Sequence, residues 1–305
     1  MTFRSGFVTL LGRPNVGKST LLNALLGTKV AAVSPRPQTT RTRLQGVLTR
    51  ETAQIVFVDT PGTHEGDSWL HRHMMRAVRE ALEGVQLVLL VADATRTPNE
   101  EDGLSLELAR GFPGPSFLLL NKIDRIAAKS TLLPLIERYR QEHNFKEFIP
   151  LSALRGENLA LLEQKIVEHL PPGPAYFPPD TLTDQPERFL AAEIIREKIF
   201  RGTRQEVPYA TAVVVDKFQE PDSVCAGGRP LARIHATLLV ERPGQKAILI
   251  GSRGARMKQI GQAAREELES LLGCKVYLKL FVRTQADWRG QGGVERLVDW
   301  RYEKT

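Results

Sequence analysis

The sequence predicts two domains of different class, an α/β domain with a doubly wound, mostly parallel sheet and a smaller α+β domain after it. The first prediction rests on short apolar runs that alternate with amphipathic segments, and these runs lie near residues 7–11, 55–58, 86–92, 116–120 and 148–151. The second prediction rests on a helix, strand, strand, helix, helix, strand order over residues 187–283. The length of 305 residues also exceeds that of one typical domain.

A proline-rich segment separates the two predicted domains. Residues 170–180 contain five prolines and one glycine, which cannot continue a helix and favour an extended, semi-rigid spacer. We therefore expect a first domain over residues 1–170, a linker over residues 171–182 and a second domain over residues 183–305.

A phosphate-binding pattern lies at the first junction of a strand and a helix. Residues 12–19 read GRPNVGKS, which is the Gly-x4-Gly-Lys-Ser pattern of a P-loop. An apolar strand precedes the pattern, and a helical segment that ends at Gly27 follows it. Backbone N–H groups and the helix N-terminus then face the phosphates of a nucleotide. A glycine-rich turn without a ligand is the alternative, which this context disfavours.

The residue types of the loop predict separate roles. Lys18 is expected to reach the β- and γ-phosphates as a catalytic residue, and the Ser19 hydroxyl is expected to bind Mg²⁺. The expected nucleotide contacts from this segment are Asn15, Val16, Gly17, Lys18, Ser19 and Thr20.

The motif DTPG follows the second apolar strand, at residues 59–62. Asp59 at the strand end can hold Mg²⁺ through a water. Gly62 is predicted to be the second catalytic residue, because a Cβ there would keep the backbone N–H away from the γ-phosphate. A loop anchored only by the γ-phosphate loses that anchor on hydrolysis, so the motif predicts a switch rather than an ordinary turn.

The segment between these motifs, residues 34–41, is polar and interrupted by prolines. It predicts a loop that closes over the triphosphate with a threonine hydroxyl on Mg²⁺. Chemistry alone leaves both Thr39 and Thr40 open for that role, and a solvated linker is the alternative reading of the segment.

The motif NKID at residues 121–124 predicts that the nucleotide base is guanine. The Asp124 carboxylate can accept hydrogen bonds from the two adjacent donors of guanine, and adenine would leave a buried carboxylate unpaired. The stem of Lys122 can lie over the purine ring, and Asn121 completes the motif. Further along, a backbone N–H of the segment Ser152, Ala153 and Leu154 could bind the guanine carbonyl oxygen.

The second domain is basic. Residues 183–305 contain 21 Lys and Arg against 16 Asp and Glu, and the stretch 242–265 contains six cations and no acid. Within this stretch lies a Gly-x-x-Gly between two helical segments, which is the clamp that KH domains use on single-stranded nucleic acid. Ile248, Leu249, Ile250 and Ile260 are expected to floor a groove for bases. The predicted RNA contacts are Lys246, Gly251, Ser252, Arg253, Gly254, Arg256, Met257 and Lys258.

Two readings of this domain stay open. Its cations could form a solvated face of an ordinary α+β domain. In the C-terminal tail, aromatic and arginine side chains could stack on bases or close the core, and the residues concerned are Trp288, Arg289, Arg296, Trp300, Arg301 and Tyr302.

Along nearly the whole chain, the motifs resemble those of the Era family of bacterial GTPases. Members of this family carry a C-terminal KH domain and act in assembly of the small ribosomal subunit. The resemblance is carried by GRPNVGKSTLLNALLG, RPQTTR, DTPG, NKID, ERFLAAEIIREKI at 187–199 and GQKAILIGSRGARMKQIG at 244–261. It implies a GTP/GDP-binding switch whose KH domain binds the 3′ end of 16S ribosomal RNA on the 30S subunit.

The resemblance also implies finer points. Thr40 becomes the better Mg²⁺ candidate of the two threonines, and Asn15 corresponds to an asparagine that helps to hold K⁺ in related GTPases. Thr63 stands where Ras-like GTPases have the glutamine that orients the attacking water, so we expect slow hydrolysis. Some members of the family associate peripherally with the inner membrane.

The composition favours a cytoplasmic protein, and we expect it to be a monomer. Two cysteines are too few for a disulfide framework, no signal peptide precedes the first strand, and no apolar stretch is long enough to span a membrane. Two other function classes stay open: an RNA-binding module with a merely structural nucleotide site, and a membrane-surface GTPase whose basic face meets lipid.

Overall fold

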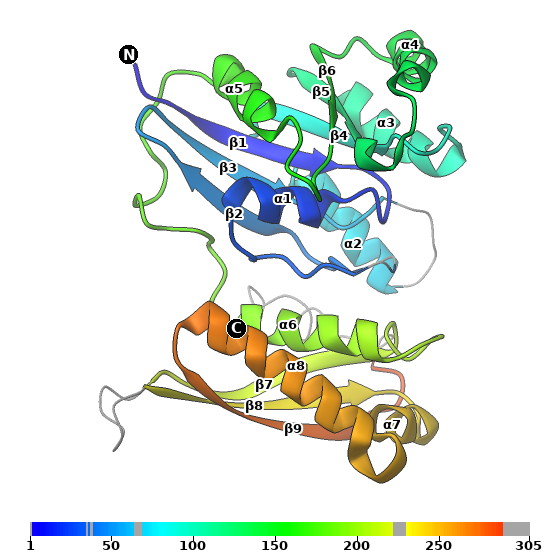
Figure 1. Ribbon diagram of the computed structural model, residues 1–305, viewed down its shortest axis with the longest axis vertical. Coiled ribbons are helices and arrows are strands. Elements are labelled where there is room, and N and C mark those ends of the chain that lie inside the picture. Colours follow the sequence, from blue (N-terminus) through cyan, green and yellow to red (C-terminus); the bar gives the residue numbers. More distant parts are fainter. Residues whose placement is uncertain (1, 35, 37–38, 64–68, 222–229, 289–305) are drawn as a thin grey trace. The chain divides into compact units, whose positions relative to one another are not determined.

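The structure is a computed structural model that describes residues 2–34, 36, 39–63, 69–221 and 230–288. The chain divides into two compact units, one formed by residues 1–67 and 71–184 and one that contains residues 185–305 (Figure 1). Each unit has its own sheet and its own hydrophobic core, and each is described separately below.

The first unit contains a six-stranded sheet in the order β2-β3-β1-β4-β5-β6. Its strands are β1 (Arg4–Leu11), β2 (Leu44–Thr49), β3 (Ala53–Asp59), β4 (Leu87–Asp93), β5 (Ser116–Asn121) and β6 (Glu147–Leu151). Its longer helices are α1 (Lys18–Leu26), α2 (Trp69–Glu80), α3 (Glu100–Gly111), α4 (Leu132–Glu142) and α5 (Leu159–His169). All strand pairs are parallel except β2–β3. This arrangement confirms the predicted doubly wound, mostly parallel sheet.

Strand β2 is the element that the sequence did not reveal. It runs antiparallel to β3 from Leu44 to Thr49, directly after the loop over residues 34–43. Its residues mix polar and apolar types in the order LQGVLT, and four of the six are buried. An edge strand of this kind lacks the continuous apolar run by which the parallel strands were recognised.

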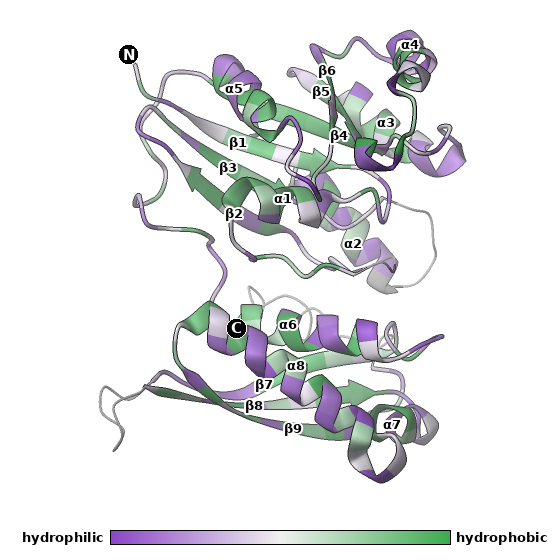
Figure 2. Ribbon diagram, in the orientation of Figure 1, coloured by the Kyte–Doolittle hydropathy of each residue, from purple (hydrophilic) through white to green (hydrophobic). Residues whose placement is uncertain are grey.

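Continuous hydrophobicity explains why the central strands are buried on both faces. Every residue of β3, β4 and β5 is buried, and these strands appear green along most of their length in Figure 2. Helices α2, α3 and α4 contribute to the core on one face of the sheet. Helix α1 packs against β2, β3 and α5. Because the parallel strands share one direction, the residues that end β1, β3, β4, β5 and β6 meet at one edge of the sheet.

The proline-rich segment lies extended against the first unit. Gln54 holds it by accepting from the backbone N–H groups of Tyr176 and Phe177 and donating to the Phe177 carbonyl. Farther on, the Val47 N–H donates to the Leu182 carbonyl, at 2.9 Å. The segment was expected to be a spacer up to residue 182, whereas the division between the two units falls between residues 184 and 185.

The second unit contains the three-stranded sheet β7-β8-β9, in which β7–β8 is antiparallel and β8–β9 is parallel. Its elements are α6 (Glu187–Gly202), β7 (Thr211–Gln219), β8 (Leu231–Val240), α7 (Pro243–Ile250), α8 (Ala255–Leu272) and β9 (Lys275–Thr284). Residues of α6, α7 and α8 share one core with alternate residues of the strands, so all three helices contribute to one face of the sheet (Figure 1). The predicted order of elements is confirmed.

Trp288 shows for one tail residue whether its ring belongs to the core or is free to stack on bases. Its side chain is fully buried against Ala212 and Leu239, and its indole N–H donates to the Ala210 carbonyl at 2.9 Å. Trp288 is therefore a core residue rather than a base-stacking one. The other tail residues named above lie outside the described residues. Among the residues that the structure describes, no helix is both long enough and apolar enough to cross a membrane.

Candidate nucleotide site and RNA-binding surface

The loop between β1 and α1 has the shape that its two glycines require. Gly12 and Gly17 have φ values of 147° and 104°, which side chains other than glycine rarely adopt. A Cβ on Gly17 would lie 2.3 Å from the side-chain nitrogen of Asn121, which donates to the Val16 carbonyl at 2.7 Å. Helix α1 begins at Lys18, so its N-terminus faces the loop and favours a bound anion.

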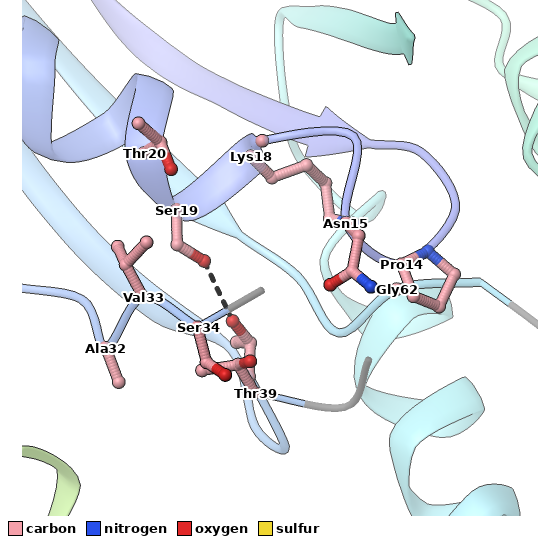
Figure 3. A pocket seen from close by; sticks show the side chains of 12 residues that line it. Pro14, Asn15, Lys18, Ser19, Thr20, Ala32, Val33, Ser34, Thr39 and Gly62 are labelled. Atoms are coloured by element: carbon pink, nitrogen blue, oxygen red, sulfur yellow. Dashed lines mark hydrogen bonds between the residues drawn. The ribbon is translucent and has the colours of Figure 1, made fainter. Parts of the chain in front are cut away.

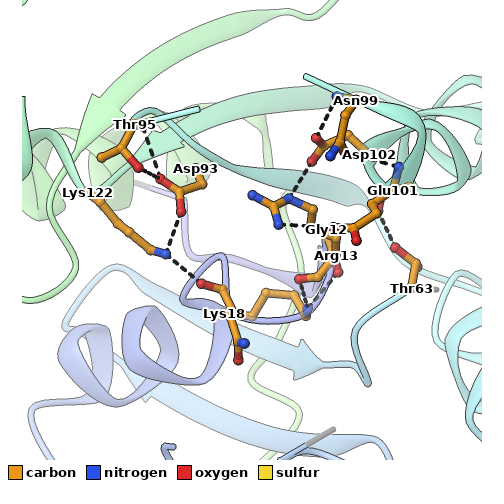
Figure 4. A network of polar contacts seen from close by, with 12 residues as sticks. Gly12, Arg13, Lys18, Thr63, Asp93, Thr95, Asn99, Glu101, Asp102 and Lys122 are labelled. Carbon is orange, nitrogen blue, oxygen red and sulfur yellow. Dashed lines mark hydrogen bonds and ion pairs between the residues drawn. The ribbon is translucent and has the colours of Figure 1, made fainter. Parts of the chain in front are cut away.

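Lys18 is a buried cation inside this loop. Its side-chain ammonium donates to the carbonyls of Gly12 and Arg13, at 2.6 and 3.1 Å, and the residue is only 6% exposed (Figure 4). Burial lowers the pKa of Lys18 to about 8, with Asp59 raising that pKa and Arg13 lowering it further. A cation held with so little solvent around it is strongly stabilised by an incoming phosphate.

Two hydroxyls and a carboxylate come together beside the loop. The Ser19 hydroxyl donates to the Asp59 carboxylate at 2.7 Å and lies 2.9 Å from the Thr40 hydroxyl. Thr39 does not join them, because its hydroxyl donates to the Arg36 carbonyl. The structure thus separates the two threonines that sequence chemistry left open. Figure 3 shows a pocket lined by Ala32, Val33, Ser34 and Thr39 on one side and by the phosphate-binding loop on the other.

The Asp59 carboxylate has capacity for one more partner. Burial raises its pKa, while Lys18 and the two hydroxyls lower it. Its Oδ1 is buried and has no hydrogen-bond partner within the described part of the chain. A set of hydroxyl and carboxylate oxygens with one unsatisfied buried oxygen fits a hard cation such as Mg²⁺.

Gly62 and Thr63 lie against the phosphate loop. A Cβ on Gly62 would lie 2.7 Å from the Cα of Pro14, and the Thr63 N–H donates to the Gly12 carbonyl at 3.2 Å. The Thr63 side chain is fully buried and its hydroxyl bonds the Ser105 hydroxyl of α3. Figure 4 shows this contact on the α3 side of the loop.

We expect Gly62→Ala to slow GTP hydrolysis at least tenfold while GDP affinity changes about twofold or less. The added methyl group must push residues 62–63 away from Pro14, and so from the place where a γ-phosphate would bind. Single-turnover hydrolysis and GDP titration measure the two effects. Gly111→Ala, at a position with nothing within 4 Å of an added Cβ, is the matched control and should change neither.

The predicted base-binding residues lie at the ends of β5 and β6. The Lys122 ammonium donates to the Asn15 carbonyl and to the Asp93 carboxylate, both at 2.6 Å. The Asp124 carboxylate accepts from the Ser152 hydroxyl at 2.5 Å. Asp124 is exposed rather than buried, so its carboxylate is accessible to a base.

The Asn121 side chain connects the phosphate-binding loop with the loop after β6 through hydrogen bonds. Its amide nitrogen donates to the Val16 carbonyl, and its Oδ1 accepts from the N–H groups of Lys122 and Ala153. The Ala153 N–H is therefore already used. The Leu154 N–H has no such partner in the described residues, and the Leu154 side chain is 73% exposed.

The ion pairs of Asp93 and of Arg13 at the site were not predicted from the sequence. Asp93 ends β4 and pairs with Lys122; burial pushes its pKa up, but the hydrogen bonds from Lys122 and Thr95 outweigh burial and lower it overall. Arg13 of the phosphate loop pairs with Asp102 at 3.0 Å, at the N-terminus of α3. The only available signal was that Asp93, like Asp59, follows an apolar strand.

The Gly-x-x-Gly segment lies between α7 and α8. Gly251 and Gly254 have φ values of 72° and 78°, and Arg253 between them is exposed with a φ of 48°. A groove of about 540 Å³ opens beside the segment, and its lining residues are Ile250, Gly254, Met257, Lys258, Gly261, Gln262, Arg265, Leu278 and Leu280.

Part of the predicted groove floor is corrected by the structure. Leu249 and Ile260 are 0% and 3% exposed and belong to the core of the second unit, because their side chains face the sheet. Of the predicted RNA contacts, Gly254, Met257 and Lys258 line the groove. Arg256 instead donates to the Ile248 carbonyl at 2.6 Å.

A family model described as 50S ribosome-binding GTPase matches residues 7–122, and a KH domain model matches residues 206–289. GTPase Era of Geobacter metallireducens is 50% identical over 94% of each chain, and GTPase Era of Trichlorobacter lovleyi is 48% identical over 94% of each chain.

Two solved structures agree with the fold along almost the whole chain. One is Era in complex with MgGDPNP and nucleotides 1506–1542 of 16S ribosomal RNA, and the other is an Aquifex aeolicus Era variant bound to GDP and aluminium fluoride. Each has a TM-score of 0.91 and 40% identity, and the match covers 98% of this chain and 99% of the other.

The fold and the site therefore define a P-loop GTPase with a C-terminal KH domain. The bound nucleotides in both solved relatives are guanine nucleotides. The chain belongs to the Era family of GTPases.

Proposed function

We propose that this GTPase is a switch that binds 16S ribosomal RNA near its 3′ end in the GTP state and assists assembly of the 30S subunit. The observation that supports it most is that one chain holds both a guanine-nucleotide site and a Gly-x-x-Gly groove. The related Era structure contains a GTP analogue and nucleotides 1506–1542 of 16S ribosomal RNA together. We further propose that the chain acts as a cytoplasmic monomer.

We assign the nucleotide contacts to the same residues that the motifs predicted. Asn15, Val16, Gly17, Lys18, Ser19 and Thr20 would hold the phosphates, and Asn121, Lys122, Asp124, Ser152, Ala153 and Leu154 would hold the base. Within the last group, Asn121 and Ala153 would act mainly by positioning the two loops, since their polar groups already pair with each other.

Mg²⁺ would be held by Ser19, Thr40 and Asp59, whose oxygens already lie together. When bound, the ion would neutralise charge on the phosphates during transfer to water. Lys18 would place its ammonium against the same phosphates, and the Gly62 N–H would contact the γ-phosphate. Loss of that phosphate would release the segments over residues 34–43 and 59–75, of which residues 35, 37, 38 and 64–68 lie outside the described residues.

Hydrolysis is expected to be slow because no described side chain near the γ-phosphate position replaces the usual glutamine. The Thr63 hydroxyl bonds Ser105 instead. We therefore expect Thr63→Ala to keep turnover within about tenfold of the parent and to lower the free energy of unfolding by about 1 kcal/mol through the lost hydrogen bond. Steady-state GTP hydrolysis and urea unfolding measure these quantities. A hundredfold loss of turnover in a folded variant would show that Thr63 takes part in catalysis.

We also propose that Asn15 helps to hold a potassium ion beside the phosphates. Asn15 has a φ of 64° and lines the same pocket as Ser19 and Gly62. Turnover should be faster in KCl than in NaCl at equal ionic strength, and Asn15→Ala should remove the difference. Equal rates in the two salts would contradict a potassium role.

The switch is tested by measuring RNA affinity in both nucleotide states. Fluorescence anisotropy with nucleotides 1506–1542 of 16S ribosomal RNA should give about 5- to 150-fold tighter binding with a GTP analogue than with GDP, which is a typical coupling. Lys258→Glu in the groove should weaken binding in both states. Identical affinity with the two nucleotides would exclude the switch and favour an RNA-binding module with a structural nucleotide site.

A further inference from the structure

The outer face of the second-unit sheet carries no helix in the described part of the chain. The core residues of β8 are Ala232, Ile234, Ala236, Leu238 and Val240, and all three helices of this unit pack with them. Strand side chains alternate between faces, so the residues between these point the other way. The register sets Arg233, His235 and Thr237 of β8 beside Tyr277, Lys279 and Phe281 of β9 on this outer face.

Within the described residues, one end of the outer face is covered by a side chain and the other end carries exposed side chains. Trp288 covers Ala212 and Leu239 at the covered end. Away from it, Tyr277 is 51% exposed and Phe281 is 46% exposed. Exposed aromatic rings on a sheet face that also carries cations offer flat surfaces on which the bases of a nucleic acid can stack.

The two rings are supported by neighbours of suitable chemistry. The Tyr277 ring lies edge-to-face with His235, with 6.3 Å between centroids. The Lys279 ammonium lies 4.9 Å from the centroid of the Phe281 ring. Tyr277 and Phe281 are four residues apart along an extended strand, or about 13 Å, so one base cannot contact both rings.

The charge of the outer face is positive. Lys217, Arg233, Lys279 and Arg283 lie on it, and the bulged residue Asp216 is the neighbouring acid. The Asp216 carboxylate accepts from the Thr237 hydroxyl at 2.7 Å. Cations that alternate with exposed rings suit a chain of phosphates and bases.

Strand β9 connects this face with the Gly-x-x-Gly groove. It is the edge strand of the sheet. Leu278 and Leu280 line the groove on the helical side, whereas Tyr277, Lys279 and Phe281 point to the outer side. A strand of RNA that leaves the groove can therefore reach the outer face by passing one β-strand.

We propose that the outer face formed by Lys217, Arg233, His235, Tyr277, Lys279 and Phe281 is a second binding surface for single-stranded RNA, continuous with the groove around the edge of β9. The rings stack on two separated bases, and the cations contact the phosphates. Two isolated rings offer too little contiguous apolar area for a stable protein interface. The proposal rests on RNA being the ligand of the second unit.

The test compares RNA fragments of different length on the full chain in the GTP-analogue state. Nucleotides 1506–1542 of 16S ribosomal RNA are shortened stepwise to the smallest fragment that still binds. We expect the double variant Tyr277→Ala, Phe281→Ala to lose at least tenfold in affinity for the long RNA and about twofold or less for the smallest fragment. Lys279→Ala with Lys217→Ala should lower the slope of log affinity against log salt for the long RNA by about 1.4.

Matched controls separate the second surface from the proposed RNA-binding function of the groove. Tyr176→Ala removes an equally exposed ring, at 50%, from the first unit and should change neither affinity. Lys258→Glu should weaken binding of every fragment. If no fragment binds the parent chain, the RNA-binding function itself fails. If Lys258→Glu acts as expected but the double variant leaves the long RNA unaffected, or weakens all fragments equally, only the second surface is refuted.

Two further measurements keep the result interpretable if a variant is unstable. Photocrosslinking of the parent chain to long RNA containing 4-thiouridine should label peptide 275–283 at Tyr277 or Phe281, and the smallest fragment should not. Labelling confined to α7 and α8 would overturn the proposal. Vesicles of phosphatidylglycerol that bind the parent but not the double variant, with RNA affinity unchanged, would make the face a lipid site and also overturn it.

Discussion

Replacing Lys18 with alanine is expected to lower kcat/KM for GTP by about 10²–10³-fold, the loss typical of removing one buried donor from developing charge. The Lys18 ammonium is already desolvated and is held by two loop carbonyls, at 2.6 and 3.1 Å. Little rearrangement is needed before it meets a phosphate. Burial also lowers its pKa to about 8, and a bound phosphate favours the charged form of the side chain.

The variant also loses the two hydrogen bonds that tie Lys18 to the loop, so loop distortion must be separated from loss of charge. Lys18→Met keeps most of the apolar stem and should lose nearly as much activity as Lys18→Ala. Lys129→Ala removes an exposed lysine from the same unit and should stay within about twofold of the parent. A Lys18→Met enzyme within tenfold of the parent would show that the ammonium does not stabilise the transferring phosphate.

Replacing Asp124 with asparagine is expected to weaken GTP binding by about 100-fold, because a bidentate pair with a base discriminates by about 1–3 kcal/mol. The asparagine amide offers one acceptor and one donor, so it keeps at most one of the two bonds to guanine. Its donor instead suits xanthine, which has a carbonyl where guanine has its amino group. Competition between GTP and xanthosine triphosphate measures the change.

The fold should survive this substitution, since an asparagine oxygen can still accept from the Ser152 hydroxyl that now bonds Asp124. Asp180→Asn makes the same change at another exposed aspartate of the first unit and should leave nucleotide preference unaltered. Unchanged preference in Asp124→Asn would mean that base selection lies elsewhere in the site.

The sequence predicted those parts of the site in which only one residue type meets the steric or chemical requirement at that position. Gly17 is an example: the structure has no room for any side chain beside Asn121, and only glycine tolerates its φ of 104°. Continuous apolar runs likewise predicted the parallel strands, because those strands are buried on both faces.

The parts that stayed hidden depend on tertiary contacts. The choice between Thr39 and Thr40 depends on which hydroxyl faces Ser19, and adjacent residues of a loop give no periodic signal. Asp93 meets Lys122 only once β4 and β5 lie side by side. Leu249 and Ile260 were expected in the groove, because the sequence does not show which face of each helix packs against the sheet.

If nucleotide state and RNA binding are coupled, thermodynamic linkage requires each ligand to change the affinity for the other by the same factor. The affinities of the full chain for GDP and for a GTP analogue should be measured with and without saturating 16S ribosomal RNA nucleotides 1506–1542. We expect RNA to raise the preference for the GTP analogue by the same factor, about 5- to 150-fold, by which the analogue tightens RNA binding. A preference that RNA leaves unchanged would show that the two sites are not coupled.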